Sequence, residues 1–491
     1  MEVVAMPPSG LNVVCILADD LGWRDLGCYG SSFYETPHLD RLAHEGARFV
    51  DAYASCPVCS PTRASVMTGM YPARVGITDW IDSWGGIHPA RGRLIDAEYV
   101  DHLPPEFPTV AEVLGDGGYA TWHVGKWHLG GAEQDALPTD RGFDLNIGGC
   151  DWGAPSGAGG YFPPWELPTL DAKPQHDRHY LPDRLGAAAA SLIDEHDHGE
   201  PFFLNYDPYL VHTPLQAPDE AVERYRSKRR ALGLDHVTEF ERGDRFPTEH
   251  KKDDHITRRL VQADPTYAAM VEALDRNVGR VIDALERNGL WNETVIIFSS
   301  DNGGLSTAEG SPTTNRPLRD GKGWMQEGGN RVPLLVRWPG VTDTSTSHTI
   351  VDTPVISPDV YPTILDAAGR APPSQHTIDG LSLRPTLVDR ERGLERDAIF
   401  WHYPHYGNQG GTPAGAVRTD SWKLIEFFED DHVELYDLSS DVSEAEDRAN
   451  EHPDRVASMR DRLHAWQNDV GAQFPSENPE FEEWPERAGP G

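Results

Sequence analysis

Residues 56–69 of the chain read Cys-Pro-Val-Cys-Ser-Pro-Thr-Arg-Ala-Ser-Val-Met-Thr-Gly. The stretch is typical of a loop that enters a helix, because Pro61 would lie near the first turn and Gly69 commonly ends a helix. Cys59 would then face the free N–H groups and positive dipole end of that helix, which together bind anions. Arg63 adds a fork-shaped donor suited to a tetrahedral oxyanion. A lone cysteine is more often a small buried apolar residue, so a functional role for Cys59 has to be supported by the rest of the sequence.

Around this stretch, short apolar runs alternate with helical patterns through the first three quarters of the chain. This alternation predicts an α/β fold with a mostly parallel sheet flanked by helices. Strands are expected at 11–18, 119–124, 202–206, 295–299 and 332–338, the last starting late because of Pro333. Helices are expected between Thr36 and Gly46, after a capping box at Thr109 and Glu112, and over 266–288.

Polar residues that packing does not explain follow several of these strands. Asp19 and Asp20 come after the first strand, and Asp301 and Asn302 come after 295–299. A single strand-end aspartate is more often a helix cap or turn former, but the carboxyl ends of strands in open α/β sheets are where ligands bind. Three carboxylates and one amide suit a hard cation such as Ca²⁺ or Mg²⁺. The lack of histidine in this set disfavours zinc.

The pattern changes after 371–373, which read Ala-Pro-Pro, and this predicts a large domain over 1–372 and a smaller α+β domain over 373–491. Short antiparallel strands are expected at 399–402, 415–418, 422–427 and 433–438, followed by a helix whose apolar stripe holds Val456, Met459, Leu463 and Trp466. Residues 219–259 are highly charged with weak periodicity and are interpreted as an insertion. The chain from about 473 is expected to wrap the surface or fray.

The composition limits the class of partner. The 491 residues include 43 Lys+Arg and 79 Asp+Glu, a formal charge of −36. A negative surface repels phosphate, so neither a nucleic acid nor an anionic membrane is expected as a partner, and an anionic substrate needs a locally positive pocket. Five cysteines in so long a chain form no disulfide framework. The sequence shows no basic and apolar leader and no transmembrane run, so a cytoplasmic protein is expected.

Residues 59–63 resemble the signature Cys-x-Pro-x-Arg of the type I, formylglycine-dependent sulfatases of the alkaline-phosphatase superfamily, with Thr62 where serine is usual. Further blocks follow in family order, namely Asp19-Asp20, Gly125-Lys126-Trp127-His128, His212-Thr213-Pro214, Asp301-Asn302-Gly303, Gly321-Lys322 and, in the small domain, Glu434–Leu438. The resemblance covers nearly the whole chain except 219–259 and the tail. The chain looks most like polysaccharide or N-acetylgalactosamine-type sulfatases.

The resemblance implies an alkaline-phosphatase-like fold, with a large mixed sheet sandwiched by helices and a smaller C-terminal α+β domain built of an antiparallel sheet and a helix. It also implies that a formylglycine-generating enzyme oxidises Cys59 to Cα-formylglycine. Asp19, Asp20, Asp301 and Asn302 would hold Ca²⁺, with Mg²⁺ as a second option, and the sulfate would be bound by Arg63, Lys126 and Lys322.

The same resemblance implies catalytic roles for two histidines. The hydrated aldehyde at position 59 would attack sulfur through one hydroxyl, and His212 would protonate the leaving alcohol oxygen. His128 would take the proton of the second hydroxyl, whose collapse releases sulfate. Histidine suits both roles because its ordinary pKa lies near working pH.

Residues 401–411 carry aromatic and imidazole groups of the kind that contact sugars, although packing between domains is the favoured role of Trp401. We expect a sulfated saccharide or other sulfated small molecule as substrate. Candidate contacts are Asp79, Trp80, His102, His402 and His405. Two alternatives stay open: a phosphodiesterase or phosphonate monoester hydrolase of the same superfamily, and a sulfated-glycan-binding protein that has lost catalysis.

Overall fold

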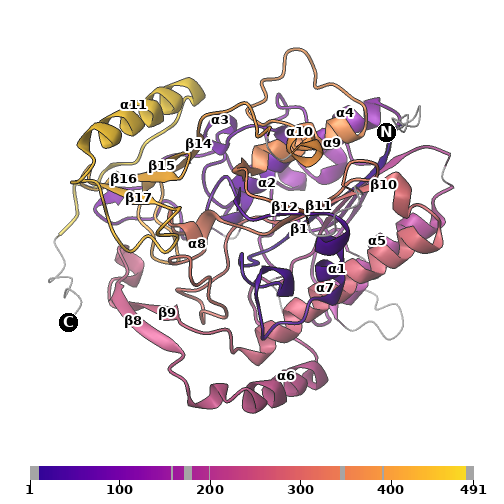
Figure 1. Cartoon of the computed structure of the whole chain (residues 1–491), viewed down its shortest axis with the longest axis horizontal. Helices are drawn as coiled ribbons and strands as arrows, with labels where there is room; N and C mark the ends of the chain where they lie inside the picture. Colours follow the sequence, from indigo (N-terminus) through magenta and orange to yellow (C-terminus); the bar gives the residue numbers. More distant parts are fainter. Residues whose placement is uncertain are drawn as a thin grey trace.

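Strand β1 (Asn12–Ala18) lies in the middle of an eight-stranded mixed sheet (Figure 1). Strands β7 (Phe202–Asp207) and β10 (Thr294–Ser300) flank it and run parallel to it. The order across the sheet is β12-β2-β11-β10-β1-β7-β5-β6. The other strands are β2 (Ala47–Phe49), β5 (Ala120–Gly125), β6 (Leu145–Ile147), β11 (Leu334–Arg337) and β12 (Thr349–Val351). This computed structural model describes residues 10–482 except 84, 156–158, 171–179, 198, 343–348 and 390–391.

Both faces of β1 are buried, which explains its continuous apolar run. Its even-numbered side chains from Val14 to Ala18 pack in one hydrophobic core, and its odd-numbered ones from Val13 to Leu17 pack in a second. The first core lies under α1 (Pro37–Glu45), α5 (Leu181–Glu195) and α7 (Pro265–Arg287), and the second under α2 (Cys59–Thr68), α4 (Val110–Asp116) and α9 (Val360–Ala367). The predicted fold class, a mixed sheet between helices, is confirmed.

Local sequence signals set several element boundaries as expected. Helix α1 starts with Pro37 at its first position and stops before Gly46. In α4 the side chain of Thr109 accepts from the backbone N–H of Glu112, and the Glu112 side chain caps Thr109 in return. Strand β11 begins directly after Pro333 and runs antiparallel to β10.

The smaller sheet is antiparallel, as predicted, and consists of β14 (Ile399–Tyr403), β15 (Ala414–Thr419), β16 (Trp422–Phe427) and β17 (Val433–Asp437). Helix α11 (Pro453–Val470) packs on one of its faces through Met459 and Leu463. On the other face Trp401 meets Tyr53 edge-on and donates a hydrogen bond to the carbonyl of Ala54, 2.8 Å away. Trp401 therefore packs between the domains, as expected. Helix α10 (Arg384–Val388) lies beyond residue 372, where the large domain was expected to end, but its Leu387 packs in the core of that domain.

Residues 219–259 are folded, although their periodicity is weak. They form α6 (Asp219–Ala231) and a two-stranded ribbon of β8 (Phe240–Arg245) and β9 (His255–Arg259), along the lower edge of Figure 1. Only Val222 and Tyr225 of α6 are buried, which explains why the sequence of this helix shows only a weak apolar periodicity. Past residue 473 the chain wraps over the large domain, where β18 (Ser476–Glu477) pairs with β4 (Leu94–Ile95). Residues 483–491 lie outside the described part.

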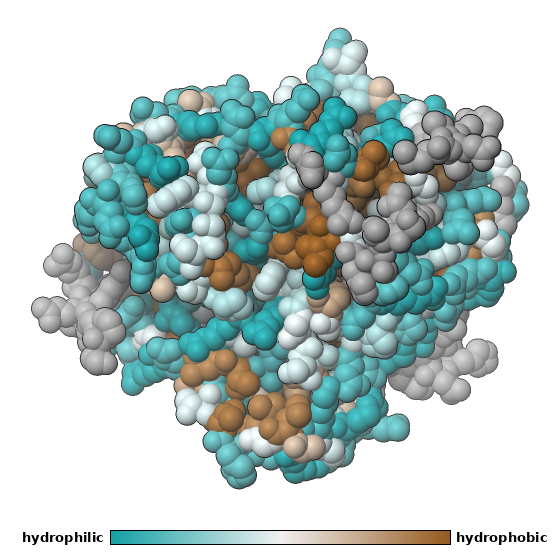
Figure 2. Space-filling view, viewed as in Figure 1, coloured by the Kyte–Doolittle hydropathy of each residue, from teal (hydrophilic) through white to brown (hydrophobic). Residues whose placement is uncertain are grey.

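The remaining short α-helices and strands are α3 (Pro72–Val75), α8 (Glu327–Asn330), β3 (Ala52–Tyr53) and β13 (Val355–Ile356). The face of the molecule seen in Figure 2 is mostly hydrophilic, in keeping with the acidic composition. Of the helices that the structure describes, none has the length and apolar character needed to cross a membrane.

Candidate active site

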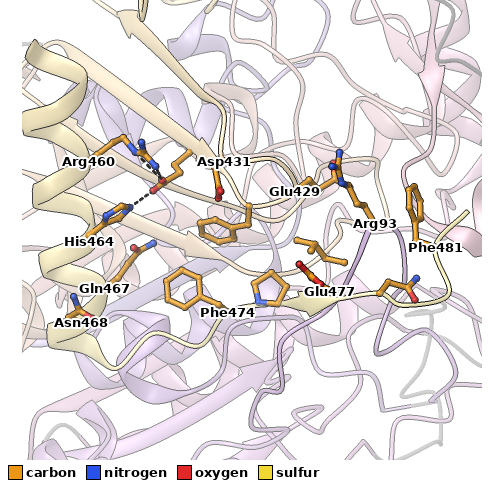
Figure 3. A pocket seen from close by; sticks show the side chains of 15 residues that line it. Arg93, Glu429, Asp431, Arg460, His464, Gln467, Asn468, Phe474, Glu477 and Phe481 are labelled. Carbon is orange, nitrogen blue, oxygen red and sulfur yellow. Dashed lines mark hydrogen bonds and ion pairs between the residues drawn. The ribbon is translucent and has the colours of Figure 1, made fainter. Parts of the chain in front are cut away.

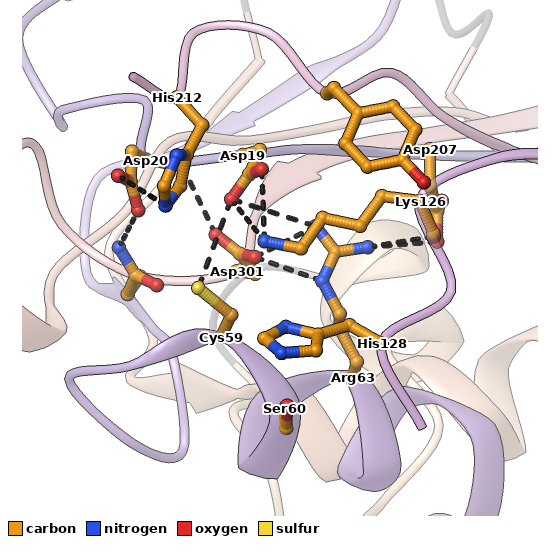
Figure 4. Close-up of polar contacts among 12 residues, drawn as sticks. Asp19, Asp20, Cys59, Ser60, Arg63, Lys126, His128, Asp207, His212 and Asp301 are labelled. Carbon is orange, nitrogen blue, oxygen red and sulfur yellow. Dashed lines mark hydrogen bonds and ion pairs between the residues drawn. The ribbon is translucent and has the colours of Figure 1, made fainter. Parts of the chain in front are cut away.

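The four predicted metal ligands meet because β1 and β10 run side by side with Ala18 opposite Ser300. This register brings Asp19 and Asp20 next to Asp301 and Asn302, all of them at most 1% exposed. The backbone N–H of Asp20 donates to Asp301 Oδ1 at 3.2 Å, and Asn302 Nδ2 donates to Asp20 Oδ1 at 2.8 Å (Figure 4). The carboxyl ends of two parallel strands thus make one oxygen-rich cluster.

This cluster fits a hard divalent cation. Asn302 Oδ1 is buried and, among the described residues, has no hydrogen-bond partner. A buried acceptor without a donor is costly, and a cation would satisfy it together with the three carboxylates. The chemistry of the donor set therefore agrees with the Ca²⁺ that the sequence predicts.

Buried cations already balance the carboxylates. Lys126 Nζ contacts both oxygens of Asp19 at 2.8 and 2.9 Å, and Lys322 Nζ lies 2.7 Å from Asp20 Oδ1. Burial alone would raise the pKa of Asp20, but Lys322 holds it below its ordinary value. For Asp19 burial outweighs Lys126 and the pKa is raised. The pKa values of the two neighbouring carboxyl groups are thus shifted in opposite directions by burial and by their lysine partners.

Cys59 was expected just before a helix and is the first residue of α2, and its Sγ lies 3.8 Å from Asp19 Oδ1. Gly69 ends the helix in the left-handed region, with φ +72°. Thr62, the departure from the usual signature, donates its hydroxyl to the carbonyl of Cys56 at 3.3 Å and stabilises the turn before the helix. Burial raises the pKa of the Cys59 thiol to about 12. As an unmodified thiol, Cys59 would be protonated and a poor nucleophile at neutral pH.

Arg63 lies behind the carboxylates instead of facing open space. Its guanidinium donates to Asp301 Oδ2 from Nε at 3.0 Å and from a terminal nitrogen at 2.7 Å. It also donates to the carbonyl of Lys126 at 3.1 Å and lies 3.3 Å from Asp207 Oδ2. Because these partners occupy the fork, Arg63 orients Asp301 and balances buried charge.

Asp207 is a buried strand-end carboxylate next to the site that the sequence analysis did not single out. It is the last residue of β7, the other parallel neighbour of β1, so the strand-end rule that found Asp19 and Asp301 applies to it equally. Burial raises its pKa to about 7 although Arg63 acts against that shift.

The two predicted catalytic histidines lie on opposite sides of Cys59 (Figure 4). His128 Nε2 lies 2.8 Å from the carbonyl of Ile81, so this nitrogen carries the hydrogen and Nδ1 carries the lone pair. Nδ1 is buried and has no hydrogen-bond partner within the described chain. Burial, with help from Lys126, holds the pKa of His128 well below its ordinary value. His128 is thus a neutral imidazole whose Nδ1 can accept a proton. The other histidine, His212, contacts a cation: its Nε2 lies 3.1 Å from Lys322 Nζ.

A pocket of about 190 Å³ opens above Cys59. Its lining residues are Cys59, Trp80, Ile81, Ile87, His128, Gly153, Ala154, His212, Glu309, Lys322, Asn408 and Gln409. Cys59, His128, His212 and Lys322 are thus the predicted catalytic residues that reach it. Glu309, Asn408 and Gln409 were not among the predicted contacts, although the last two lie within residues 401–411, which were noted in the sequence.

Of the predicted substrate contacts, Trp80 lines this pocket and the other four do not. Asp79 and His405 are fully buried and face each other, with Asp79 Oδ2 3.8 Å from His405 Nδ1. His402 lies under the tail, with Nε2 2.6 Å from the carbonyl of Gln473. His102 pairs with the neighbouring Asp101.

A larger hollow of about 850 Å³ lies elsewhere, between α11 and the returning tail (Figure 3). Glu426, Arg460 and His464 form ion pairs on its wall, and no cysteine lines it. The smaller pocket, which Cys59, His128, His212 and Lys322 line, is therefore the candidate active site. A candidate nucleophile beside an oxygen-rich cluster at strand ends is an arrangement that suits a metal-assisted hydrolase.

Comparison with known proteins narrows this class. The Sulfatase family model matches residues 11–370, and the model of the N-sulphoglucosamine sulphohydrolase C-terminal region matches 320–469. Human arylsulfatase A is 32% identical, over 86% of this chain and 75% of its own. Human N-acetylgalactosamine-6-sulfatase is 31% identical, over 80% of this chain and 69% of its own. The crystal structure of Ps i-CgsB in complex with k-i-k-neocarrahexaose has a TM-score of 0.73 at 28% identity, covering 96% of this chain and 95% of that one.

The chain belongs to the sulfatase family. It is a sulfatase, a hydrolase of sulfuric esters, and its relatives share the alkaline-phosphatase-like fold.

Proposed function

We propose that this sulfatase removes sulfate from a sulfated saccharide, using a Cα-formylglycine made from Cys59 and a Ca²⁺ ion held by Asp19, Asp20, Asp301 and Asn302. The observation that carries the proposal is the position of Cys59 Sγ, 3.8 Å from Asp19 Oδ1 and at the start of α2. The raised pKa of its thiol supports modification, because an aldehyde hydrate offers a nucleophilic hydroxyl where a protonated thiol does not.

Ca²⁺ would supply Lewis-acid polarisation of a sulfate oxygen. The chain's own residues divide the remaining tasks. The ammonium group of Lys322 reaches the pocket and binds a sulfate oxygen, while Lys126 and Arg63 keep the carboxylates behind it in place. His128 Nδ1 accepts a proton from the group at position 59, and His212, once it is protonated at Nε2, delivers the Nε2 proton to the leaving alcohol.

A saccharide is favoured by the pocket wall and by the relatives. The indole of Trp80 and the amides of Asn408 and Gln409 surround the opening, and such groups bind the faces and hydroxyls of sugars. One relative is named N-acetylgalactosamine-6-sulfatase, and one solved structure of the family holds a neocarrahexaose. The family match favours sulfate over phosphonate esters, and a phosphonate monoester hydrolase at 19% identity shares the fold alone. The enzyme names of the relatives likewise favour catalysis over glycan binding.

The proposal is tested by producing the chain together with a formylglycine-generating enzyme and measuring two quantities. The first is the mass of the peptide that contains Cys59, expected to show conversion of thiol to aldehyde and to react with a hydrazide. The second is sulfate release from a panel of sulfated mono- and oligosaccharides. Cys59→Ala should abolish release, while Cys56→Ala, which removes a buried cysteine outside the pocket, should keep it. Full activity with wholly unmodified Cys59 would contradict the proposal.

A further inference from the structure

A carboxylate, Glu309, lines the pocket above Cys59 and has no part in the chemistry described so far. It lies in the long segment between β10 and α8, and its residue is exposed. Lys322, which lines the same pocket, is only 5% exposed and contacts Asp20. The pocket therefore has a positive charge at its buried end and a negative charge at its opening.

Two amides of the small domain hold this carboxylate by one of its oxygens. Asn408 Nδ2 donates to Glu309 Oε1 at 3.2 Å, and Gln409 Nε2 donates to the same oxygen at 2.8 Å. Both amide residues lie between β14 and β15 and line the pocket themselves. Within the described part of the chain, Oε2 accepts no hydrogen bond. Glu309 therefore keeps one oxygen free to accept from a hydroxyl group of a substrate.

The backbone on both sides of Glu309 is also fixed. On one side the hydroxyl of Thr307 donates to the carbonyl of Gln409 at 3.0 Å. On the other side the hydroxyl of Ser311 donates to the carbonyl of Thr257, on β9, at 2.7 Å. Glu309 itself has φ +52°, in the left-handed region that costs free energy for a residue with a side chain. Contacts with the small domain and with the β8–β9 ribbon thus hold the carboxylate at the opening.

The pocket offers positive charge for one anionic group. Among the residues that the structure describes, Lys322 is the one lysine or arginine that lines it, and its ammonium is proposed to bind the sulfate. The two histidines of the pocket are the proposed acid and base. Lys251 lies nearby, but its Nζ donates to the carbonyl of Asn408 at 2.7 Å and it does not line the pocket. A second anionic group on a substrate would meet Glu309 and no free cation of the described chain.

We propose that Glu309 is a specificity residue that restricts the substrate to a sugar carrying one sulfate and no second sulfate or carboxylate on the ring in the pocket. This inference rests on the proposed function, because it takes the pocket to bind a sulfated sugar through Lys322. Like charges brought together in a pocket repel, so a second anionic group weakens binding. A neutral sugar hydroxyl instead donates a hydrogen bond to Glu309 Oε2. The substrate class is therefore a singly sulfated, otherwise uncharged sugar.

The test compares paired substrates that differ in charge and hardly in size. One pair is a sulfated hexose that carries a carboxymethyl or a carbamoylmethyl ether on a neighbouring hydroxyl. The other pair is 4-nitrophenyl sulfate with a carboxylate or a carboxamide on the ring. The values of kcat and KM are measured for wild type, for Glu309→Gln, whose amide oxygen can still accept from Asn408 and Gln409, and for Glu106→Gln. The last variant is the matched control, because it removes an exposed carboxylate that does not line the pocket.

We expect wild type and Glu106→Gln to favour the neutral member of each pair about tenfold in kcat/KM, because repulsion raises KM for the charged member. Glu309→Gln should lose most of this preference. Ionic strength gives a second readout that a purely structural role would not change. Raising the salt from about 0.05 M to about 0.5 M shortens the Debye length, so the preference should shrink more in wild type than in Glu309→Gln.

Equal kcat/KM for the two members of each pair in wild type would overturn the proposal, and so would an unchanged preference in Glu309→Gln. The charge-reversed variant Glu309→Lys should favour the charged member, and a preference for the neutral one would count equally against the proposal. If the aryl sulfates release sulfate and the sulfated sugars do not, the saccharide assignment fails. The aryl pair then still decides whether Glu309 selects by charge, so the two failures are distinguishable.

Discussion

Lys322 Nζ lies 3.1 Å from His212 Nε2 at the wall of the pocket. His212 Nδ1 lies 2.8 Å from the carbonyl of Thr213, and because a carbonyl can only accept, Nδ1 carries the hydrogen. Nε2 therefore carries the lone pair and accepts from the ammonium group. The same ammonium contacts Asp20, so the proposed acid, the lysine proposed to bind sulfate and the proposed metal ligands form one connected network.

Replacing His212 should affect substrates according to their leaving groups. A sugar alkoxide must be protonated as the S–O bond breaks, whereas nitrophenolate leaves unaided. His212→Ala should therefore reduce kcat for a sulfated saccharide about 10²–10⁴-fold more than for nitrophenyl sulfate. Both rates are measured on the same preparation, with His102→Ala as the control. Equal losses on the two substrates would mean that His212 positions the sulfate group and is not the acid.

Replacing Asp301 should remove metal and turnover together. The carboxylate follows β10 and belongs to the oxygen cluster, so Asp301→Asn removes one of the three negative charges that would hold the cation. Asp207→Asn is a matched control, because it also removes a carboxylate beside Arg63 but outside the cluster. We expect Ca²⁺ content and sulfate release to fall to background in the first variant and to stay near wild type in the second. Normal metal content in Asp301→Asn would assign the site to other residues.

The strand-end residues could be predicted from the sequence because two local facts fix their position. A continuous apolar run marks a buried parallel strand, and a polar residue after it must lie at the ligand-binding edge. This reasoning found Asp19 and Asp301 but was not applied to Asp207, which obeys it equally. The capping signals around α1 and α4 are local in the same way and gave the correct boundaries.

The pocket wall could not be predicted so well because it depends on contacts between distant segments. Asn408 and Gln409 line the pocket only because the small domain packs on the large one through Trp401. Arg63 and Lys126 were expected to bind the sulfate, but Arg63 donates to Asp301, Lys126 donates to Asp19, and neither is among the residues that line the pocket. Neither effect has a periodic signal in the sequence.

The folded protein should lose stability in acid partly through His123. This residue is fully buried on β5, and burial lowers its pKa to about 3. The unfolded chain takes up a proton below about pH 6.5 while the folded chain does not, so the free energy of unfolding falls as pH drops from 6.5 towards 3. The slope is about 1.4 kcal/mol per pH unit. In urea unfolding between pH 7.5 and 5, His123→Gln should show a smaller loss than wild type, and His102→Gln an unchanged one. Parallel pH dependence in all three proteins would contradict this assignment.

Replacing His128 should separate the two halves of the reaction. Its Nδ1 is a buried lone pair beside Cys59, and the low pKa keeps it unprotonated and ready to accept the proton whose loss releases sulfate. His128→Ala should therefore release the first equivalent of nitrophenol per active site and then turn over about 10²–10⁴-fold more slowly. The stalled protein should carry a sulfate group on the peptide that contains residue 59, seen by mass spectrometry. A variant that loses the initial burst as well would show that His128 acts before the leaving group departs.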